Sequence, residues 1–186
     1  GEDMAARFLD NLEAIVAAEL ALPVRAAVDW LAHELATRHG RGVLGVLFYG
    51  SCLRQTTDEG VLDFWVVVDD YLGAYRNPLL AWINPIAPPN VFYLEREFEG
   101  HTLRTKYGVI SRRAFDRGTS FRAFHPYVFA RFAQPTRLIA CRDDAARRFF
   151  EGCLARSIEV MVGRLLCLLP RRGGLMRFSL AAFWQE

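Results

Sequence analysis

The hydrophobic positions near the N-terminus recur at helical spacing, which predicts two helices ahead of the first strand. Residues 4–21 are expected to form an amphipathic helix. Its expected inner face consists of Phe8, Leu12, Ile15, Val16 and Leu20. A second helix is expected to open at Pro23 and to end at the Gly-Arg-Gly sequence of residues 40–42. Its expected inner face consists of Val24, Val28, Leu31 and Leu35.

The spacing then changes to that of strands. Residues 43–49 (VLGVLFY) and 62–68 (LDFWVVV) are short apolar runs typical of buried strands. Residues 90–98 and 103–110 alternate between apolar and polar on either side of Glu99-Gly100. Two alternating segments joined by so short a turn predict a hairpin.

Helices are expected again after the hairpin. One is predicted to begin after Ser111, which suits a helix cap, and to run to Ala133. The sequence TRLIA at residues 136–140 predicts a short last strand, and a long apolar-rich helix is expected from Asp143 to Leu169. Residues 175–186 are expected to form a helix that continues past the end of the given sequence.

This order of elements predicts an α/β (α+β) fold, with a mixed sheet of four to five strands between N-terminal and C-terminal helices. Residues 1–42 are expected to form an N-terminal helical segment and residues 43–142 the core. Residues 143–186 are expected to form a C-terminal helical segment that is incomplete. Between residues 73 and 90 the chain has four prolines, so this stretch is expected to be mainly loop.

The composition suits a well-packed domain without a strong electrostatic field. The chain has 186 residues, of which 52% are hydrophobic, and a formal net charge of +2 at pH 7. Because that charge attracts polyanions only weakly, nucleic acid is not expected as a partner. The four cysteines form no CxxC pair, so reduced thiols without structural zinc are expected. The sequence has neither a basic leader nor an apolar run long enough to span a bilayer, which predicts a cytoplasmic location.

Residues 48–70 (FYGSCLRQTTDEGVLDFWVVVDD) carry the pattern with the clearest chemistry. One strand ends at Gly50-Ser51, and a second strand that carries Asp63 follows. The glycine lets the backbone approach a polyphosphate closely, and the next amides and the Ser51 hydroxyl can donate hydrogen bonds to phosphate oxygens. Asp63 can supply an anionic oxygen to Mg²⁺ that bridges the phosphates. We therefore expect Gly50 and Ser51 to cradle a nucleoside triphosphate and Asp63 to hold a catalytic magnesium ion.

This spacing resembles that of the DNA polymerase β-like nucleotidyltransferase superfamily, whose signature is a hydrophobic residue, Gly-Ser, a gap and an acidic strand. The resemblance implies a nucleotidyltransferase-type sheet. The superfamily usually has two alternating acids on this strand, whereas this chain has Trp65 two positions after Asp63. Asp69 lies roughly 20 Å farther along a strand. Glu95 is therefore expected as the second metal ligand, with Glu97 as the other candidate on the same face of the hairpin.

A wider set of motifs follows in one order along the chain. The motifs are YGS at 49–51, LDFWVVVDD at 62–70, VFYLE at 91–95, LRTKYGVIS at 103–111 and FARFAQPTRL at 129–138. Together they resemble the mitochondrial translocator assembly and maintenance protein family, which are phosphatidate cytidylyltransferases, and its bacterial relatives. The resemblance spans residues 43–140.

The resemblance implies that the chain transfers CMP from CTP to phosphatidate, giving CDP-diacylglycerol and pyrophosphate, with Mg²⁺ as cofactor. Asp63 and Lys106 are the expected catalytic residues. The family's tyrosine-glycine-serine and lysine-tyrosine-glycine motifs imply a set of nucleotide-binding residues, which are Tyr49, Gly50, Ser51, Lys106 and Tyr107. A lipid acceptor also implies peripheral contact with the inner face of a membrane. The N-terminal helix or the Arg-rich and aromatic C-terminal part is expected to provide that contact.

Lys106 also stands out on physical grounds. It is the only lysine among the 23 basic residues, and it lies inside the KYGVIS motif. An ammonium group is a compact point charge that suits a phosphate oxygen, whereas a guanidinium group presents a planar fork. We therefore expect Lys106 to stabilise phosphate charge.

Two alternatives keep the fold and change the activity. The acceptor would be a small molecule, a protein or an RNA end, or the domain would bind nucleotide without turnover. Trp65 at the usual acid position favours the second of these. A hydrolase triad of Ser51, His125 and an aspartate is disfavoured, because Ser51 lacks the Gly-x-Ser-x-Gly turn.

Overall fold

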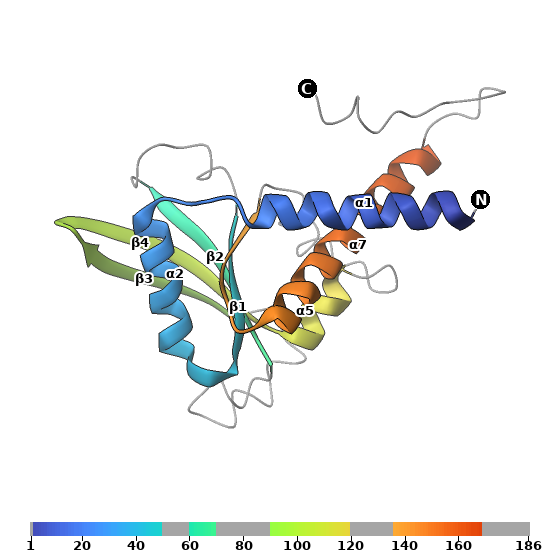
Figure 1. Ribbon diagram of the computed structural model, residues 1–186. Helices are drawn as coiled ribbons and strands as arrows, with labels where there is room; N and C mark the ends of the chain where they lie inside the picture. The colour runs from blue at the N-terminus through green and yellow to red at the C-terminus, as the bar shows by residue number, and fades with distance from the viewer. Residues whose placement is uncertain (1, 50–59, 70–89, 120–135, 169–186) are drawn as a thin grey trace.

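A five-stranded mixed sheet between two helical layers forms the protein, as seen in a computed structural model (Figure 1). The structure describes residues 2–49, 60–69, 90–119 and 136–168. The helices of this part are α1 (Glu2–Leu20), α2 (Ala26–His39), α5 (Arg112–Thr119) and α7 (Asp144–Leu168), with a 3-10 turn η1 (Gly40–Gly42). The strands are β1 (Val43–Tyr49), β2 (Val61–Val68), β3 (Asn90–Phe98), β4 (His101–Ser111) and β5 (Thr136–Cys141). The fold is α+β.

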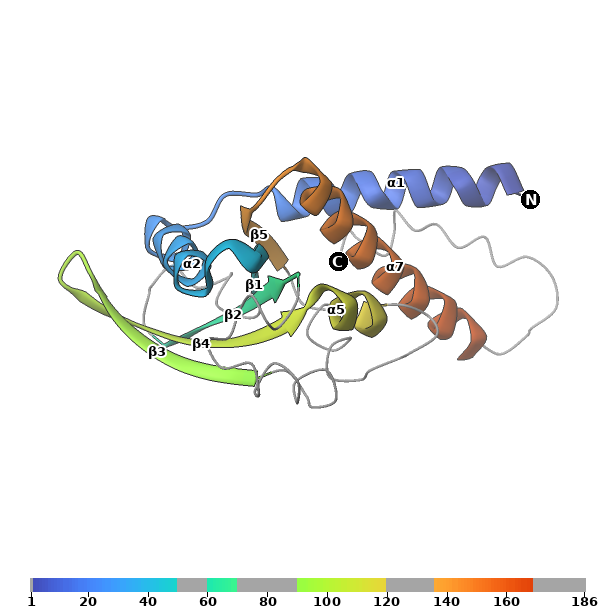
Figure 2. The same ribbon diagram turned by 90° about the horizontal axis from the view of Figure 1, so that it is seen from below.

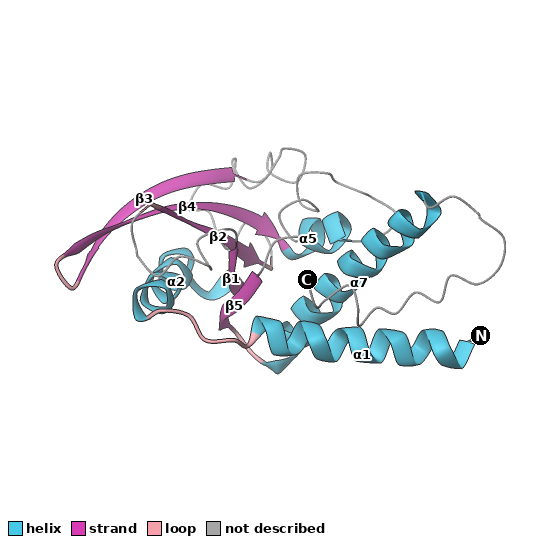
Figure 3. Cartoon of the chain, turned by 90° about the horizontal axis from the view of Figure 1, so that it is seen from above, coloured by secondary structure: helices cyan, strands magenta, loops and turns pink. Residues whose placement is uncertain are grey.

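The strands lie in the order β3-β4-β2-β1-β5. β2 and β4 run parallel, and every other neighbouring pair is antiparallel. Helix α2 covers one face of the sheet, while α1, α5 and α7 gather on the other (Figure 3). The β3–β4 hairpin reaches beyond the helices, so its tip is covered least (Figure 2).

β1 is buried at every position and β2 from Phe64 to Val68, because both faces of the sheet are covered there. On one face Phe48 and Phe64 pack with the core side of α2. On the other face Trp65 packs in a cluster with Phe115 of α5 and Phe150 of α7. The outer half of β4 alternates between exposed and buried residues, since only α2 covers it. The hydrophobic pattern therefore records how many layers cover each strand.

The expected strands and the hairpin are confirmed. Glu99 and Gly100 both have positive φ, 47° and 79°, as a two-residue hairpin turn requires. The expected cap at Ser111 is confirmed by the hydrogen bond that the Ala114 amide donates to the Ser111 Oγ at 3.1 Å. Asp143 caps α7 in the same way, with its Oδ1 2.7 Å from the Ala146 nitrogen. Polar side chains thus fix both helix starts.

Two details of the N-terminal helices differ from expectation. Ile15 was expected on the buried face of α1 but is 50% exposed, because only a narrow stripe of this helix is covered. The second helix begins at Ala26 rather than at Pro23, with Arg25 as the residue before its first turn. The expected helix beyond Thr119, the loop at 73–90 and the helix at 175–186 lie outside the described residues.

Within the described residues, no helix is both long enough and apolar enough to cross a membrane. This agrees with the absence of a long apolar run in the sequence.

Gly45 in β1 supports a close contact between the sheet and α7. A Cβ atom at this position would lie 2.5 Å from Phe150 Cε2 and 3.0 Å from the Ala140 carbonyl oxygen. We expect Gly45→Ala to lower the free energy of unfolding by about 1–3 kcal/mol, because the packed ring and the backbone must both move. Gly152→Ala in α7 is the matched control: a Cβ there meets nothing within 4 Å. Urea denaturation that found Gly45→Ala as stable as Gly152→Ala would contradict this packing.

Candidate functional site

Strand register brings Asp63 and Lys106 side by side. Asp63 of β2 is the Cα partner of Lys106 on β4 and of Tyr49 on β1. The row continues outward to Tyr93 on β3 and to Thr136 on β5. Residues paired across neighbouring strands point to the same face of a sheet. The five side chains therefore form one row across the face that α1, α5 and α7 partly cover.

Burial decreases along this row. Tyr49 is 5% exposed and its ring centroid lies 6.3 Å from that of Trp65. Asp63 is half-buried, and Lys106 is exposed. Tyr93, at the far side, is 58% exposed. A carboxylate and an ammonium group thus stand where the covered part of the sheet face opens to solvent.

The charges around Lys106 leave its ammonium group available. In the residues that the structure describes, Lys106 has no ion pair or hydrogen bond. The neighbouring cation Arg104 is neutralised by Glu95, with Nε 3.6 Å from Oε1. Glu95 also accepts a hydrogen bond from the Tyr93 hydroxyl at 2.8 Å, which raises the pKa of Tyr93. Among the described residues the Lys106 ammonium group is thus engaged in no ion pair, and the carboxylate next to it on this face is that of Asp63.

Trp65, two positions after Asp63 on β2, is part of the core. It is 1% exposed. Its ring lies over Gly108, the residue paired with it on β4, so that a Cβ atom on Gly108 would lie 3.0 Å from Trp65 Cζ3. Gly108 therefore makes room for the indole ring. The glycine of the KYGVIS motif has a packing role in this chain.

The structure does not bring Tyr107 together with Asp63. Tyr107 is 2% exposed and points to the α2 face, where its hydroxyl lies 3.1 Å from His39 Nε2 and its ring stacks on Phe92 at 5.4 Å. Burial is the main cause that raises the pKa of Tyr107. Since successive strand residues face opposite ways, Tyr107 has to point away from the row that contains Lys106.

Glu95 lies away from Asp63. Two strand spacings and two residues along the strand separate them, which gives about 12 Å between their Cα atoms. Glu97 lies farther along β3 and accepts a hydrogen bond from Thr102 Oγ1 at 2.6 Å. The described residues contain no group of three or more His, Cys, Asp or Glu side chains placed to hold a metal ion. Of the two expected metal ligands, Asp63 therefore lies beside Lys106, whereas Glu95 lies about 12 Å from Asp63 between Cα atoms.

Gly50 and Ser51, the expected phosphate-binding residues, lie outside the described residues, as does His125. The residue before Gly50 is Tyr49, the partner of Asp63. The chain therefore leaves β1 next to Asp63.

Sequence reasoning missed Tyr93 as a neighbour of Lys106. The period of two from Glu95 already puts Tyr93 on the same face of β3. The register of the hairpin, fixed by its two-residue turn, then makes Tyr93 the partner of Lys106. Thr136 carried no such signal, because the place of β5 at the sheet edge depends on the whole topology.

Chemically, the row offers one carboxylate that can bind a hard cation and one ammonium group that can bind a phosphate oxygen. Comparison with known proteins adds no family: no protein-family model matches the chain, and no curated protein matches it.

Proposed function

We propose that the chain is a Mg²⁺-dependent nucleotidyltransferase that transfers CMP from CTP to phosphatidate. The observation that carries the proposal is the pairing of Asp63 with Lys106 on one face, next to the end of β1. The motif resemblance supports the choice of CTP and phosphatidate. In this proposal Gly50, Ser51 and Lys106 contact the nucleotide. The expected contact by the Tyr49 side chain is not retained, because it is 5% exposed and packs on Trp65, and Tyr107 supports the strand from the opposite face.

The residues present suit magnesium bound together with a triphosphate. Mg²⁺ commonly uses one or two protein carboxylates and completes its shell with phosphate oxygens and water. Asp63 would supply the carboxylate, and the ion would neutralise charge on the phosphates. A dedicated cage of protein ligands is not needed for such a site. This removes the need for Glu95 as a second ligand.

The proposed reaction forms one bond and breaks one. A phosphate oxygen of phosphatidate attacks the α-phosphorus of CTP, and the bond from that phosphorus to the oxygen bridging to the β-phosphate breaks. CDP-diacylglycerol and pyrophosphate are the products. The attacking oxygen is already anionic at neutral pH, so the chain needs no strong general base. Its residues hold the two substrates in line, and Lys106 offsets phosphate charge.

A direct assay tests this function. Purified protein is incubated with CTP labelled in its α-phosphate, Mg²⁺ and phosphatidate in mixed micelles, and the organic phase is counted. We expect label in CDP-diacylglycerol, with an equal amount of pyrophosphate. Pyrophosphate release that depends on a different acceptor would keep the reaction class and replace the lipid. Absence of both products with every acceptor would refute the proposed nucleotidyltransferase activity.

A nucleotide-binding domain without turnover is the second candidate, and the burial of Trp65 favours it. A buried indole at this position leaves the strand with one acid for catalysis. Tight binding of magnesium and CTP without release of pyrophosphate, whatever acceptor is supplied, would establish this candidate instead.

Membrane contact through α1 receives little support from charge. The helix carries the acids Glu2, Asp3, Asp10, Glu13 and Glu19 against a single arginine, Arg7. Its exposed apolar residues include Met4 and Ile15. Anionic lipids such as phosphatidate attract basic segments and repel acidic ones. The proposed peripheral contact at the inner face of the membrane therefore falls to another part of the chain.

Lys106 provides a test of the charge role. We expect Lys106→Ala to lower kcat/KM for CTP about tenfold, because one charge-assisted hydrogen bond to a phosphate oxygen would be lost. Lys106→Arg should retain a kcat/KM between those of the wild type and Lys106→Ala, because the planar guanidinium group places its charge differently from an ammonium group. Arg104→Ala is the control, since Glu95 already neutralises Arg104. Equal kinetics for Lys106→Ala and Arg104→Ala would remove Lys106 from the site.

A further inference from the structure

Three exposed apolar side chains lie on the same face of the sheet as Asp63 and Lys106. They are Val61, Val91 and Tyr93, which are 40%, 50% and 58% exposed. Tyr93 is the strand partner of Lys106. Val91 and Val61 each lie two residues before a member of this row, so they share its face. Single apolar residues are ordinary on a surface, but three around one ammonium group suit a ligand with an anionic and an apolar part.

The exposed residues of β3 are not an extension of the core. The apolar residues on the opposite face of β3, which are Phe92, Leu94 and Phe98, pack in the cluster under α2. The β3–β4 hairpin reaches beyond the helices on the other face (Figure 2). Since Val91 and Tyr93 are at least half exposed, a ligand can contact them without displacing core side chains.

The charges beside these residues suit one phosphate group. Lys106 has no ion pair within the residues that the structure describes. Glu95, the next residue along this face of β3, is compensated by Arg104, with 3.6 Å between its Oε1 and the Arg104 Nε. Glu95 also accepts the hydrogen bond from the Tyr93 hydroxyl at 2.8 Å. The polar end of Tyr93 is therefore satisfied, and its ring remains for apolar contact.

An in-line displacement restricts where the acceptor of the proposed reaction enters. The attacking oxygen and the leaving pyrophosphate lie on opposite sides of the phosphorus. The proposed phosphate-binding residues Gly50 and Ser51 follow the end of β1, and magnesium is proposed at Asp63 of β2. β1 and β4 lie on opposite sides of β2. A triphosphate that runs from β1 to β2 thus directs the acceptor toward β4 and β3.

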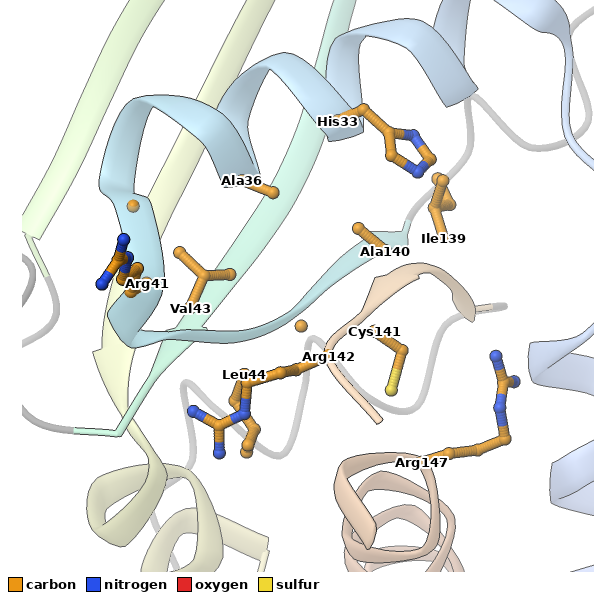
Figure 4. Close-up of a pocket in the computed structure, with 12 residues that line it drawn as sticks. His33, Ala36, Arg41, Val43, Leu44, Ile139, Ala140, Cys141, Arg142 and Arg147 are labelled. Atoms are coloured by element: carbon orange, nitrogen blue, oxygen red, sulfur yellow. The ribbon is translucent and has the colours of Figure 1, made fainter. Parts of the chain in front are cut away.

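The cavity of about 600 Å³ at the other end of β1 does not suit the acceptor phosphate. Figure 4 shows two of its arginines, Arg41 and Arg147, on opposite sides, so its positive charge is not gathered at one point. Val43, in its wall, begins β1, whereas Tyr49, the partner of Asp63, ends it. Six residues of extended chain put these ends about 20 Å apart. A phosphate in this cavity would therefore not reach a nucleotide at Asp63.

We propose that the acceptor is a lipid phosphate monoester that binds over β4 and β3, with its phosphate at Lys106 and its apolar part against Tyr93 and Val91. This inference rests on the proposed function and adds where its acceptor binds. An ammonium group has three donors, so Lys106 can bind an oxygen of the acceptor as well as one of the nucleotide. Tyr93 lies one strand spacing, about 5 Å, beyond Lys106, which puts apolar surface directly next to the phosphate.

Lys106 reports on acceptor binding directly, because it is the only lysine of the chain. Its acetylation by an N-hydroxysuccinimide ester is followed by mass spectrometry of its peptide. We expect dioctanoyl phosphatidate, below its micelle concentration and without CTP, to slow the acetylation. Dioctanoyl phosphatidylcholine lacks the phosphate monoester, and glycerol 3-phosphate lacks the apolar part. Each should protect at least about tenfold more weakly.

Variants test the apolar contact. Val91→Ser and Tyr93→Ser are each expected to raise the dissociation constant of dioctanoyl phosphatidate about tenfold, because each removes apolar surface that the ligand would cover. Tyr93→Phe keeps the ring and should bind like the wild type. Ile15→Ser is the matched control, since Ile15 is also 50% exposed but lies on α1. The KM for CTP should change less than about twofold in every variant.

The inference and the proposed function fail in different ways. The inference is overturned if phosphatidate does not protect Lys106, if glycerol 3-phosphate protects equally, or if Val91→Ser and Tyr93→Ser bind as tightly as Ile15→Ser. Protection of Lys106 by magnesium and CTP in such a protein would still support the nucleotide site. Conversely, phosphatidate binding that depends on Val91 and Tyr93 in a protein without transfer of CMP would uphold the lipid site and refute the proposed reaction.

Discussion

Replacing Asp63 by asparagine is expected to lower CTP-dependent formation of CDP-diacylglycerol by at least about 100-fold. Loss of groups that only support metal ligands already costs about 10–100-fold, and loss of the ligand itself should cost more. Asparagine keeps the size of the side chain but removes the anionic oxygen that a hard cation prefers. Counting label in the organic phase, with pyrophosphate measured in parallel, gives the ratio to the wild type.

The control for Asp63→Asn is Glu97→Gln, which makes the same chemical change on the same face of the sheet. Glu97 is exposed and bonded to Thr102, so its replacement should leave activity within about twofold. Both proteins should unfold at similar urea concentrations, because neither carboxylate is fully buried. Full activity in Asp63→Asn would take Asp63 out of the mechanism, together with the magnesium proposed there.

The hydrophobic pattern predicted the elements well because it follows directly from layer coverage. Strand runs such as residues 43–49 are apolar at every position when both faces are covered, and such runs are visible in one dimension. The exposure of Ile15 shows the limit of this reasoning. An apolar residue at helical spacing reveals which face of α1 is apolar, and only the tertiary structure determines how much of that face another element covers.

Neighbours across the sheet were harder to predict. The parallel pairing of β2 with β4 joins segments that are far apart in sequence, and no local signal fixes its register. The adjacency of Asp63 and Lys106 therefore needed the structure. For Glu95, the alternation of strand residues predicted which face of the sheet it lies on. Its distance from Asp63 could not be predicted, because it depends on the β2–β4 and β3–β4 registers. The sequence alone could have predicted that Tyr107 faces away from Lys106, because neighbouring residues of a strand point to opposite faces.

Placing an acid at position 65, two residues after Asp63 on β2, should damage the fold without improving the proposed catalysis. We expect Trp65→Asp to lower the free energy of unfolding by at least about 3–5 kcal/mol, the usual cost of removing a buried aromatic side chain. A carboxylate in the space of an indole that is 1% exposed adds a desolvation cost. Urea denaturation followed by circular dichroism measures the loss.

The control is Trp65→Phe, which keeps an aromatic ring over Gly108 and against Tyr49 and should lose less stability. A stable Trp65→Asp protein with raised transferase activity would mean that this strand accepts two metal-binding acids, contrary to the role of Trp65 as core. The expected result, unfolding without any gain in rate, follows from the packing. The indole occupies a site closed by Gly108 and covered by α5 and α7, so the magnesium site proposed at this strand would depend on Asp63 and on the phosphates of the substrate.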